Sequence, residues 1–303
     1  MSVGSSRPRL LLVGGGGGLV GRSVLPAFLP GWTVRSVHRN RVDAESGPNV
    51  ERVAVDVASV RDWGPLLDGV DCVLTLAWYR WERAEAFRSL AEGLRRCLAA
   101  SVERRVPRFL HVSVPDGPAG LERELPYFVE KRGFDRALAE SGLSYRILRP
   151  TLLFGEGDRL LGPMMRLMQR YRRFPIFGDG GYHVSPLATA DLADILLREA
   201  TRSEVGTVDL GGPVRFTYRE LTDRLFAAVG RAPRYFHLSR RGALALTRMM
   251  VALGSRLLYP YEVEWLMSDR LGLPAYAGLG RELRPLAPYL ESAARQLRRA
   301  RPP

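Results

Sequence analysis

The chain of 303 residues has a single lysine, Lys131, among 45 basic residues, and only two cysteines. Cys72 and Cys97 stand in apolar segments without Cys-x-x-Cys spacing, which excludes a disulfide framework and predicts buried thiols in a reducing compartment. The four histidines are far apart and lack the spacing of metal ligands, so we expect no metal site. No run of about 18 apolar residues occurs, and glycines follow the short run Leu10–Val13 at once, leaving no signal-peptide core. We therefore expect a cytoplasmic protein.

The basic residues exceed the acidic ones by 13 and are almost all arginine. So complete a replacement of Lys by Arg is typical of compositional drift, and the Arg pairs are scattered along the chain. The charge therefore favours a solvated basic surface, and we do not expect nucleic-acid binding. A composition of 46% apolar and 25% charged residues is that of an ordinary globular protein.

Short apolar runs alternate with longer segments of helical spacing over the first half of the chain. The predicted strands are Arg9–Val13, Thr33–Val37, Arg52–Val55, Cys72–Leu76, Arg108–Val112, Tyr145–Leu148 and Thr207–Leu210. Runs without polar alternation indicate strands that are buried on both faces of a parallel sheet. The pattern predicts an α/β fold, a doubly wound Rossmann sheet with a smaller, mainly helical C-terminal substrate region. We place the dinucleotide-binding domain at 1–155 and the substrate or lid region at 156–303, with 184–211 returning to the sheet.

A glycine-rich turn follows the first predicted strand and opens a helix. It contains Gly15-x-x-Gly18-x-x-Gly21, and we expect Gly17 and Leu19 within the same turn to contact a cofactor as well. Such a turn lets backbone N–H groups approach a pyrophosphate, which the helix N-terminus also stabilises. Because strand, turn and apolar helix come in this order, we interpret the glycines as a dinucleotide-binding site.

The end of the second predicted strand favours one nicotinamide cofactor over the other. An NAD site usually places an acid there for the ribose hydroxyls, but this chain has Arg39. A guanidinium suits a 2′-phosphate, so NADP(H) is favoured over NAD(H). Asp56, before Val57, is placed either to meet the adenine amino group or to cap the segment that follows.

Tyr127 and Lys131 lie four residues apart in a segment that Pro126 opens as a helix, so both are on one face. A cation held beside a phenol stabilises the phenolate and lowers its pKa toward the working range. Ser113 follows the fifth predicted strand at the sheet edge where ligands bind. These three residues are the candidate catalytic group.

Together these motifs resemble the short-chain dehydrogenase/reductase superfamily, over about residues 9–155. They are similar to its atypical, extended branch, which includes the nucleotide-binding accessory subunit of respiratory complex I and NmrA-like proteins. The resemblance implies that Ser113 orients a carbonyl, Tyr127 acts as acid and base, and Lys131 lowers its pKa and holds the ribose. It also implies cofactor contacts from residues at three further places, namely Asp56 and Val57, Leu76 and Ala77, and Pro150 and Thr151. The sequence departs from the pattern at Gly14, where threonine is common, and in the aromatic run Trp78-Tyr79-Arg80-Trp81.

The sequence thus predicts an NADP(H)-dependent oxidoreductase of a carbonyl/alcohol pair. Two alternatives stay open: an epimerase or dehydratase that retains its cofactor, and a non-catalytic sensor or assembly factor that only binds NAD(P)H. The expected partner is a small molecule, apolar or aromatic if the aromatic run lines the pocket, and the oligomeric state is open. The segment His237–Tyr259 has the pattern of a basic amphipathic helix, for which packing on the core is favoured over binding to a membrane surface.

Overall fold

The computed structural model describes residues 7–14, 17–39, 47–80, 83–118, 120–171 and 173–299. The chain forms two compact units, and the first comprises residues 1–114, 122–149 and 189–208. The second comprises residues 115–121, 150–188 and 209–303. A compact unit is not by itself an independently folding domain, so the domain limits expected from the sequence stay predictions.

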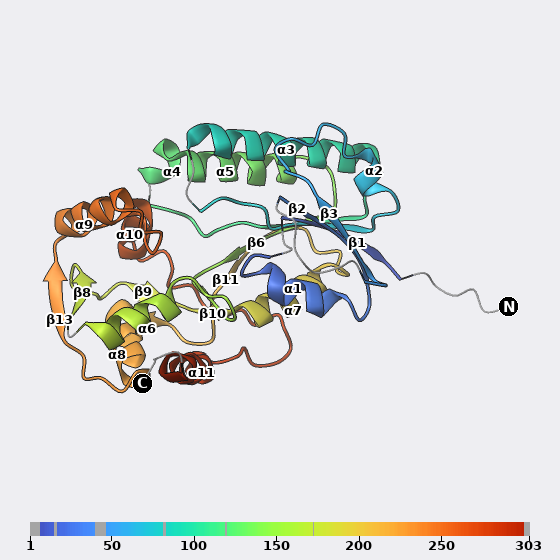
Figure 1. Ribbon diagram of the computed structural model, residues 1–303. Coiled ribbons are helices and arrows are strands. Elements are labelled where there is room, and N and C mark those ends of the chain that lie inside the picture. Colours follow the sequence, from blue (N-terminus) through green and yellow to red (C-terminus); the bar gives the residue numbers. More distant parts are fainter. Residues whose placement is uncertain are drawn as a thin grey trace. The chain divides into compact units, whose positions relative to one another are not determined.

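A seven-stranded sheet is the centre of the first unit (Figure 1). Across the sheet the strands follow in the order β11 (Gly206–Leu210), β6 (Tyr145–Pro150), β5 (Arg108–Val112), β4 (Cys72–Thr75), β1 (Arg9–Val13), β2 (Thr33–His38) and β3 (Val50–Ala54). Each neighbouring pair from β6 to β3 is parallel. The order reverses beside β1, which is where open parallel sheets bind their ligands. The predicted Rossmann-like α/β fold is therefore confirmed.

Helices cover both faces of this sheet. α1 (Gly21–Phe28) and α7 (Thr189–Glu199) pack together below it in Figure 1, and α2 (Gly64–Leu67), α3 (Ala84–Glu103) and α5 (Pro126–Ala139) lie above it. Because both faces are covered, the strands are apolar throughout, and Leu10, Leu11 and Leu12 are fully buried. Cys72 and Cys97 are buried free thiols, as expected.

Helix α3 comes unusually close to the backbone that follows β3. A Cβ atom added at Gly93, in the middle of the helix, would lie 2.2 Å from the carbonyl oxygen of Val57. Only a residue without a side chain allows this approach, which brings Val57 to the carboxyl end of the sheet.

The second unit has a core of its own, made by helices on small strand pairs. Its helices are α6 (Leu161–Arg170), α8 (Tyr218–Ala228), α9 (Arg240–Ala252), α10 (Pro260–Met267) and α11 (Leu286–Arg299). Its strand pairs are β7 (Leu153–Phe154) with β10 (Leu187–Ala188), β9 (His183–Val184) with β12 (Phe216–Thr217), and β8 (Phe174–Phe177) with β13 (Tyr235–Leu238). Met164, Met165 and Met168 of α6 are buried in this core, as expected of the apolar face of a helix.

One expected helix is shorter than its pattern indicated. The segment His237–Tyr259 begins inside β13, which pairs with β8 through Leu238. Ser239 then caps α9, because its side chain accepts a hydrogen bond from the backbone N–H of Gly242. The helix ends before Gly254, whose φ of 84° favours glycine.

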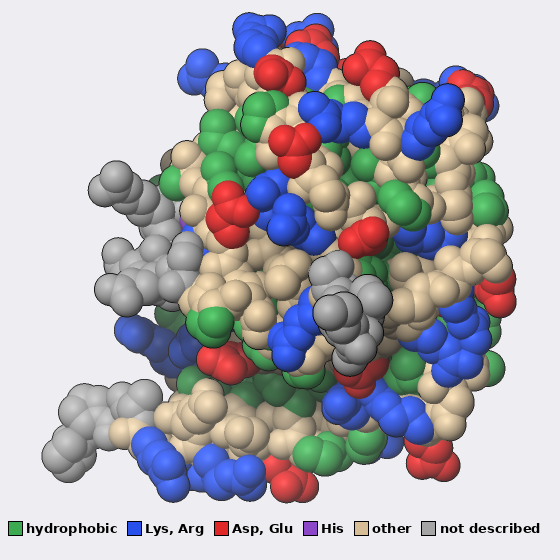
Figure 2. Space-filling model, turned by 90° about the vertical axis from the view of Figure 1, so that its right-hand side faces the viewer, with side chains coloured by type: hydrophobic (Ala, Val, Ile, Leu, Met, Phe, Trp, Pro, Cys, Tyr) green, Lys and Arg blue, Asp and Glu red, His purple; other side chains and the backbone are tan. Residues whose placement is uncertain are grey.

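The surface and the helices bear on two expectations about partners. On the face of the molecule shown in Figure 2, acidic side chains are interspersed with the Arg side chains and no field of a single sign forms. Among the helices of the described ranges, none is both long enough and apolar enough to cross a membrane.

Candidate functional site

The glycine turn lies between the carboxyl end of β1 and the start of α1. Gly14 has a φ of 84°, and its N–H donates to the carbonyl oxygen of Val37 at 2.8 Å. A Cβ atom at Gly14 would lie 2.3 Å from the Cβ of Ala77, so the threonine that the resemblance leads one to expect cannot fit beside this alanine. At Gly17 and Gly18 an added Cβ would meet no atom within 4 Å, which leaves open space at the N-terminus of α1. Gly15 lies outside the described residues.

The other residues of this turn and its neighbour strand are placed as follows. Gly21 is the first residue of α1 and is buried, while Leu19 is half-buried. Leu76 and Ala77 extend β4, because both N–H groups donate to the carbonyl oxygen of Val13. The backbone of these residues therefore borders the glycine turn.

Arg39 and Asp56 lie just beyond the carboxyl ends of β2 and β3. Arg39 is exposed, and its guanidinium lies 5.4 Å from the centre of the Tyr79 ring. The Asp56 carboxylate accepts a hydrogen bond from the N–H of Ala58 at 3.0 Å, in a turn and not at the start of a helix. Val57, the next residue, is buried against α3.

Helix α5 brings Tyr127 and Lys131 to one face, as their spacing predicted. Pro126 begins the helix, where a missing N–H costs nothing. The Tyr127 ring makes edge contacts with Trp78 and Phe87, with centroids 6.2 and 5.9 Å apart. The aromatic residue after Ala77 therefore packs on the candidate acid/base residue.

Lys131 is 3% exposed, and its Nζ has few partners. It donates to the carbonyl oxygen of Val112 at 3.1 Å and lies 4.4 Å from the centre of the Trp78 ring. An ammonium has three N–H donors, and no second hydrogen bond forms with the residues that the structure describes. Burial lowers the pKa of Lys131 to about 7, against the opposing effect of the Asp135 carboxylate and together with that of Arg132.

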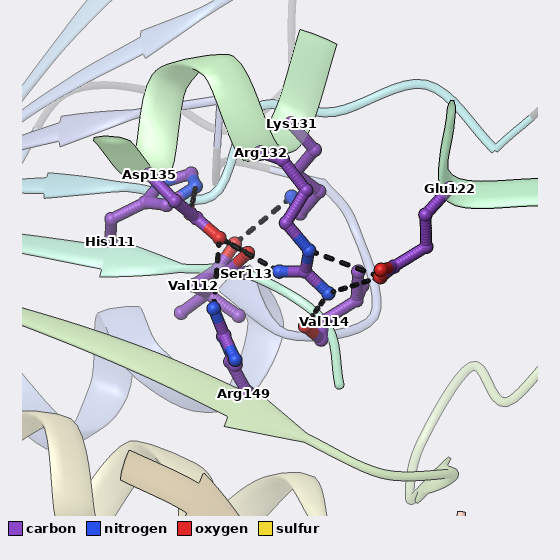
Figure 3. Close-up of polar contacts among 9 residues, drawn as sticks. All are labelled: His111, Val112, Ser113, Val114, Glu122, Lys131, Arg132, Asp135 and Arg149. Carbon is purple, nitrogen blue, oxygen red and sulfur yellow. Dashed lines mark hydrogen bonds and ion pairs between the residues drawn. The ribbon is translucent and has the colours of Figure 1, made fainter. Parts of the chain in front are cut away.

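A buried polar cluster surrounds Asp135, one further turn along α5 (Figure 3). Ser113 donates to its Oδ2 at 2.8 Å, and Arg132 Nη1 lies 2.8 Å from the same oxygen. Arg149 Nη2 is 3.7 Å from Oδ2, and His111 Nε2 is 3.5 Å from Oδ1. Burial, with the charges of Lys131 and Arg132, holds the pKa of His111 well below its usual value, so the imidazole is neutral. The carboxylate is thus held by two guanidinium groups and a hydroxyl.

This cluster fixes the direction of the Ser113 hydroxyl. Its proton points to Asp135, so its oxygen is left to accept a hydrogen bond. Arg132 is held in turn by the carbonyl oxygen of Val114 at 3.0 Å and by Glu122 at 3.3 Å. Both anchors lie on the segment from β5 to α5, so the cluster also ties that segment to the helix (Figure 3).

Pro150 and Thr151 belong to the second unit and are described within it. Pro150 is the last residue of β6. Thr151 is buried, and its hydroxyl donates to the carbonyl oxygen of Ser185. Its N–H donates to the carbonyl oxygen of Leu210 at 3.1 Å.

The sequence did not reveal Asp135 and its arginines as partners of Ser113. A signal was present, since Asp135 follows Tyr127 and Lys131 at intervals of four residues on one helix face. The sequence left open whether Trp78 lines a pocket or packs in the core, and it did not predict the contact of its ring with the ammonium of Lys131. Within the described part of the chain, no group of three His, Cys, Asp or Glu side chains could hold a metal ion.

The low pKa of Lys131 predicts how stability depends on pH. Between a folded pKa of about 7 and the usual value of 10.5, the unfolded chain binds one proton more than the folded chain. The free energy of unfolding therefore rises with pH over this window, and the cost of burying the amine is largest below it. We expect wild type to gain a few kcal/mol relative to Lys131→Met between about pH 7 and about pH 10. Urea denaturation of both proteins across this range measures the difference, and parallel curves would contradict the shifted pKa.

Comparisons with known proteins show similarity to NAD(P)H-binding proteins. A family model described as NAD(P)H-binding matches residues 15–165. The chain is 26% identical over 257 residues to a 2-alkyl-3-oxoalkanoate reductase of Stenotrophomonas maltophilia. This alignment covers 74% of the present chain and 76% of the reductase. It is also 32% identical over 95 residues to subunit 9 of the NADH dehydrogenase 1 alpha subcomplex of Arabidopsis thaliana. That alignment covers only 30% of this chain and 24% of the relative.

The fold extends the likeness over nearly the whole chain. One similar structure is that of UDP-glucuronic acid 4-epimerase of Bacillus cereus, solved in complex with NAD. The superposition covers 95% of the present chain and 99% of the epimerase chain, and its TM-score is 0.66. At 16% identity this likeness concerns the fold alone. The family match shows an NAD(P)H-binding region over residues 15–165, and the likeness in fold agrees with the resemblance of the motifs to the short-chain dehydrogenase/reductase superfamily.

Proposed function

We propose that this protein is an NADP(H)-dependent oxidoreductase of a carbonyl/alcohol pair, with Ser113, Tyr127 and Lys131 as its catalytic group. The observation that carries the proposal is the buried ammonium of Lys131, one helical turn from Tyr127 and with a single hydrogen bond among the described residues. Hydroxyl groups of a nicotinamide ribose would supply acceptors for its remaining N–H donors. The open space at Gly17 and Gly18 would admit a pyrophosphate at the start of α1.

In this proposal a bound nicotinamide supplies or accepts the hydride, and the residues of the chain handle the proton. Tyr127 transfers the proton to or from the substrate oxygen. In its protonated form Lys131 favours the phenolate form of the neighbouring ring. Trp78 and Phe87 pack on the phenol ring and limit its movement.

Ser113 has a more specific part in this mechanism. Its proton is bound by Asp135 at 2.8 Å, so in this proposal the hydroxyl turns from the carboxylate to donate to the substrate oxygen. A carbonyl oxygen and the oxygen of an alcohol can both accept this hydrogen bond, which leaves the single O–H proton of the alcohol directed to Tyr127. Substrates are best sought among small molecules with apolar chains, because the reductase relative is named for a 2-alkyl-3-oxoalkanoate.

Two other functions use the same residues. An epimerase or dehydratase would retain its cofactor and would show no net consumption of NADPH; of these two, the structural neighbour is named an epimerase. A non-catalytic sensor or assembly factor would bind the cofactor without turnover. Calorimetric titration with NADPH and NADH, followed by a panel of alkyl-substituted 3-oxoacids and their alcohols, separates these cases. Failure to bind either nucleotide would overturn the proposal and both alternatives.

The preference for NADP(H) depends on Arg39, which is exposed beyond the end of β2. A charged hydrogen bond to a 2′-phosphate contributes about 1.5–3 kcal/mol. We therefore expect Arg39→Ala to weaken NADPH binding roughly 10–100-fold and to leave NADH binding unchanged. Arg61→Ala, which also removes an exposed guanidinium from the first unit, serves as the control and should change neither affinity. An equal loss for both nucleotides in Arg39→Ala would show that Arg39 does not bind the phosphate.

A further inference from the structure

One stretch of the second unit is basic without any acidic residue. From Arg224 to Tyr261 the chain has seven Arg residues and no Asp or Glu. The chain as a whole has 32 acidic residues to 45 basic ones, so such a gap departs from its usual mixture. Helix α9 lies at the centre of this stretch, next to β13 and α10 (Figure 1).

The two faces of α9 differ sharply in burial. Ala243 and Thr247 are buried on the inner face. The outer face consists of exposed residues at helical spacing, namely Arg241, Ala245, Arg248, Met249, Ala252 and Leu253. Met249 is 55% exposed and Leu253, at the C-terminal end of the helix, is 80% exposed. Two large apolar side chains thus protrude one turn apart beside two arginines.

The arginines of this outer face are not used within the fold. Arg240, at the start of α9, is paired with Glu264 of α10 at 2.5 Å. Neither Arg241 nor Arg248 makes a hydrogen bond or an ion pair with any residue that the structure describes. Their charge is therefore available to an anionic partner.

We propose that the outer face of α9 is a docking surface for an anionic lipid membrane, with Met249 and Leu253 inserted among the acyl chains and Arg241 and Arg248 at the headgroups. An interfacial helix combines these features, an apolar strip that enters the boundary of the acyl chains and basic residues that meet the lipid phosphates. A membrane of anionic lipids also supplies negative charge to the exposed guanidinium groups of Arg241 and Arg248. This property is independent of cofactor binding and of the proposed reaction.

Nucleic acid is the other polyanion that such arginines could meet. Phosphate contacts with a nucleic-acid backbone depend on charge, and they gain nothing from exposed Met and Leu side chains. The apolar pair therefore favours the lipid surface. It also provides the means to tell the two partners apart.

The test is co-sedimentation of the purified protein with vesicles of phosphatidylglycerol and phosphatidylcholine in equal parts, and with vesicles of phosphatidylcholine alone. We expect binding to the anionic vesicles only. We expect it to fall at least about tenfold in Met249→Ser/Leu253→Ser, and by a similar factor in Arg241→Gln/Arg248→Gln. Because all four side chains are exposed, the variants should unfold at the same temperature as wild type.

Matched variants in the first unit control for general effects of charge and apolarity. Val102→Ser/Val205→Ser removes two exposed apolar side chains, and Arg61→Gln/Arg136→Gln removes two exposed guanidinium groups. Both should bind the vesicles as wild type does. The proposal is overturned if wild type ignores the anionic vesicles, or if the α9 variants bind as well as the controls. The same variants are also tested for retention on DNA. The proposal is overturned if the arginine substitutions weaken binding to DNA and to vesicles equally while the Met/Leu substitutions weaken neither.

Discussion

A Lys131→Met protein is expected to lose hydride transfer by roughly 10²–10⁴-fold, the contribution typical of a positioned acid/base system. Methionine has a similar length and no charge, so it replaces the side chain without a cation over the Trp78 ring. Tyr127 would lose the cation that favours its phenolate, and the cofactor ribose would lose its donor. The measurement is single-turnover loss of reduced nicotinamide absorbance with a substrate found in the panel described above.

This variant has an unusual internal control, because removing the buried amine should not weaken the fold at neutral pH. The desolvation that lowers the pKa of Lys131 disappears with the amine. A loss of activity in a protein at least as stable as wild type therefore reports on chemistry and not on folding. Arg136→Met, on the exposed side of the same helix, should retain full activity. Turnover by Lys131→Met at the rate of wild type would exclude Lys131 from the catalytic group.

Gly93→Ala is expected to cause a large loss of stability from a single added methyl group. The new Cβ would lie 2.2 Å from the carbonyl oxygen of Val57 and 2.8 Å from its carbonyl carbon. Both atoms belong to the backbone, so relief requires α3 or the segment after β3 to move. We expect about 3 kcal/mol or more of lost unfolding free energy, at the upper end of overpacking effects, measured by urea denaturation.

Gly133→Ala, in α5, is the matched control. Its added Cβ would meet only the guanidinium end of Arg95, at 2.9 Å, and that flexible side chain can swing aside. The usual gain of about 0.5–1 kcal/mol for alanine over glycine in a helix would then offset most of the disturbance. If both variants lost the same stability, the close approach of α3 to Val57 would not be the cause.

The sheet could be predicted from the sequence because strands covered on both faces are apolar throughout. The predicted runs at Arg9–Val13 and Arg108–Val112 match β1 and β5 in full. The third predicted run begins two residues after the start of β3 and ends one residue after its end. β3 lies at the edge of the sheet and none of its residues is buried, so its apolar signal is weaker. The strand β13 was missed because Phe236 and His237 are exposed, so its pairing with β8 leaves little trace in the sequence.

Some contacts of the candidate site join residues that are close in the sequence, and others join residues that are far apart. Tyr127 and Lys131 could be found by their spacing on one helix. The bond from Ser113 to Asp135 joins residues 22 apart, and the contact of Trp78 with Lys131 joins different elements. Such pairs depend on how β4, β5 and α5 pack, which periodicity does not reveal.

Lys131 is the only side-chain amine of the protein. Since burial brings its pKa to about 7, much of this amine is unprotonated near neutral pH. Acylating reagents attack the unprotonated form, so modification of lysine side chains in this chain reports on one atom, at the proposed cofactor site. The burial that tunes the residue also limits the access of reagents to it, and the rate of acylation therefore measures how often the site opens.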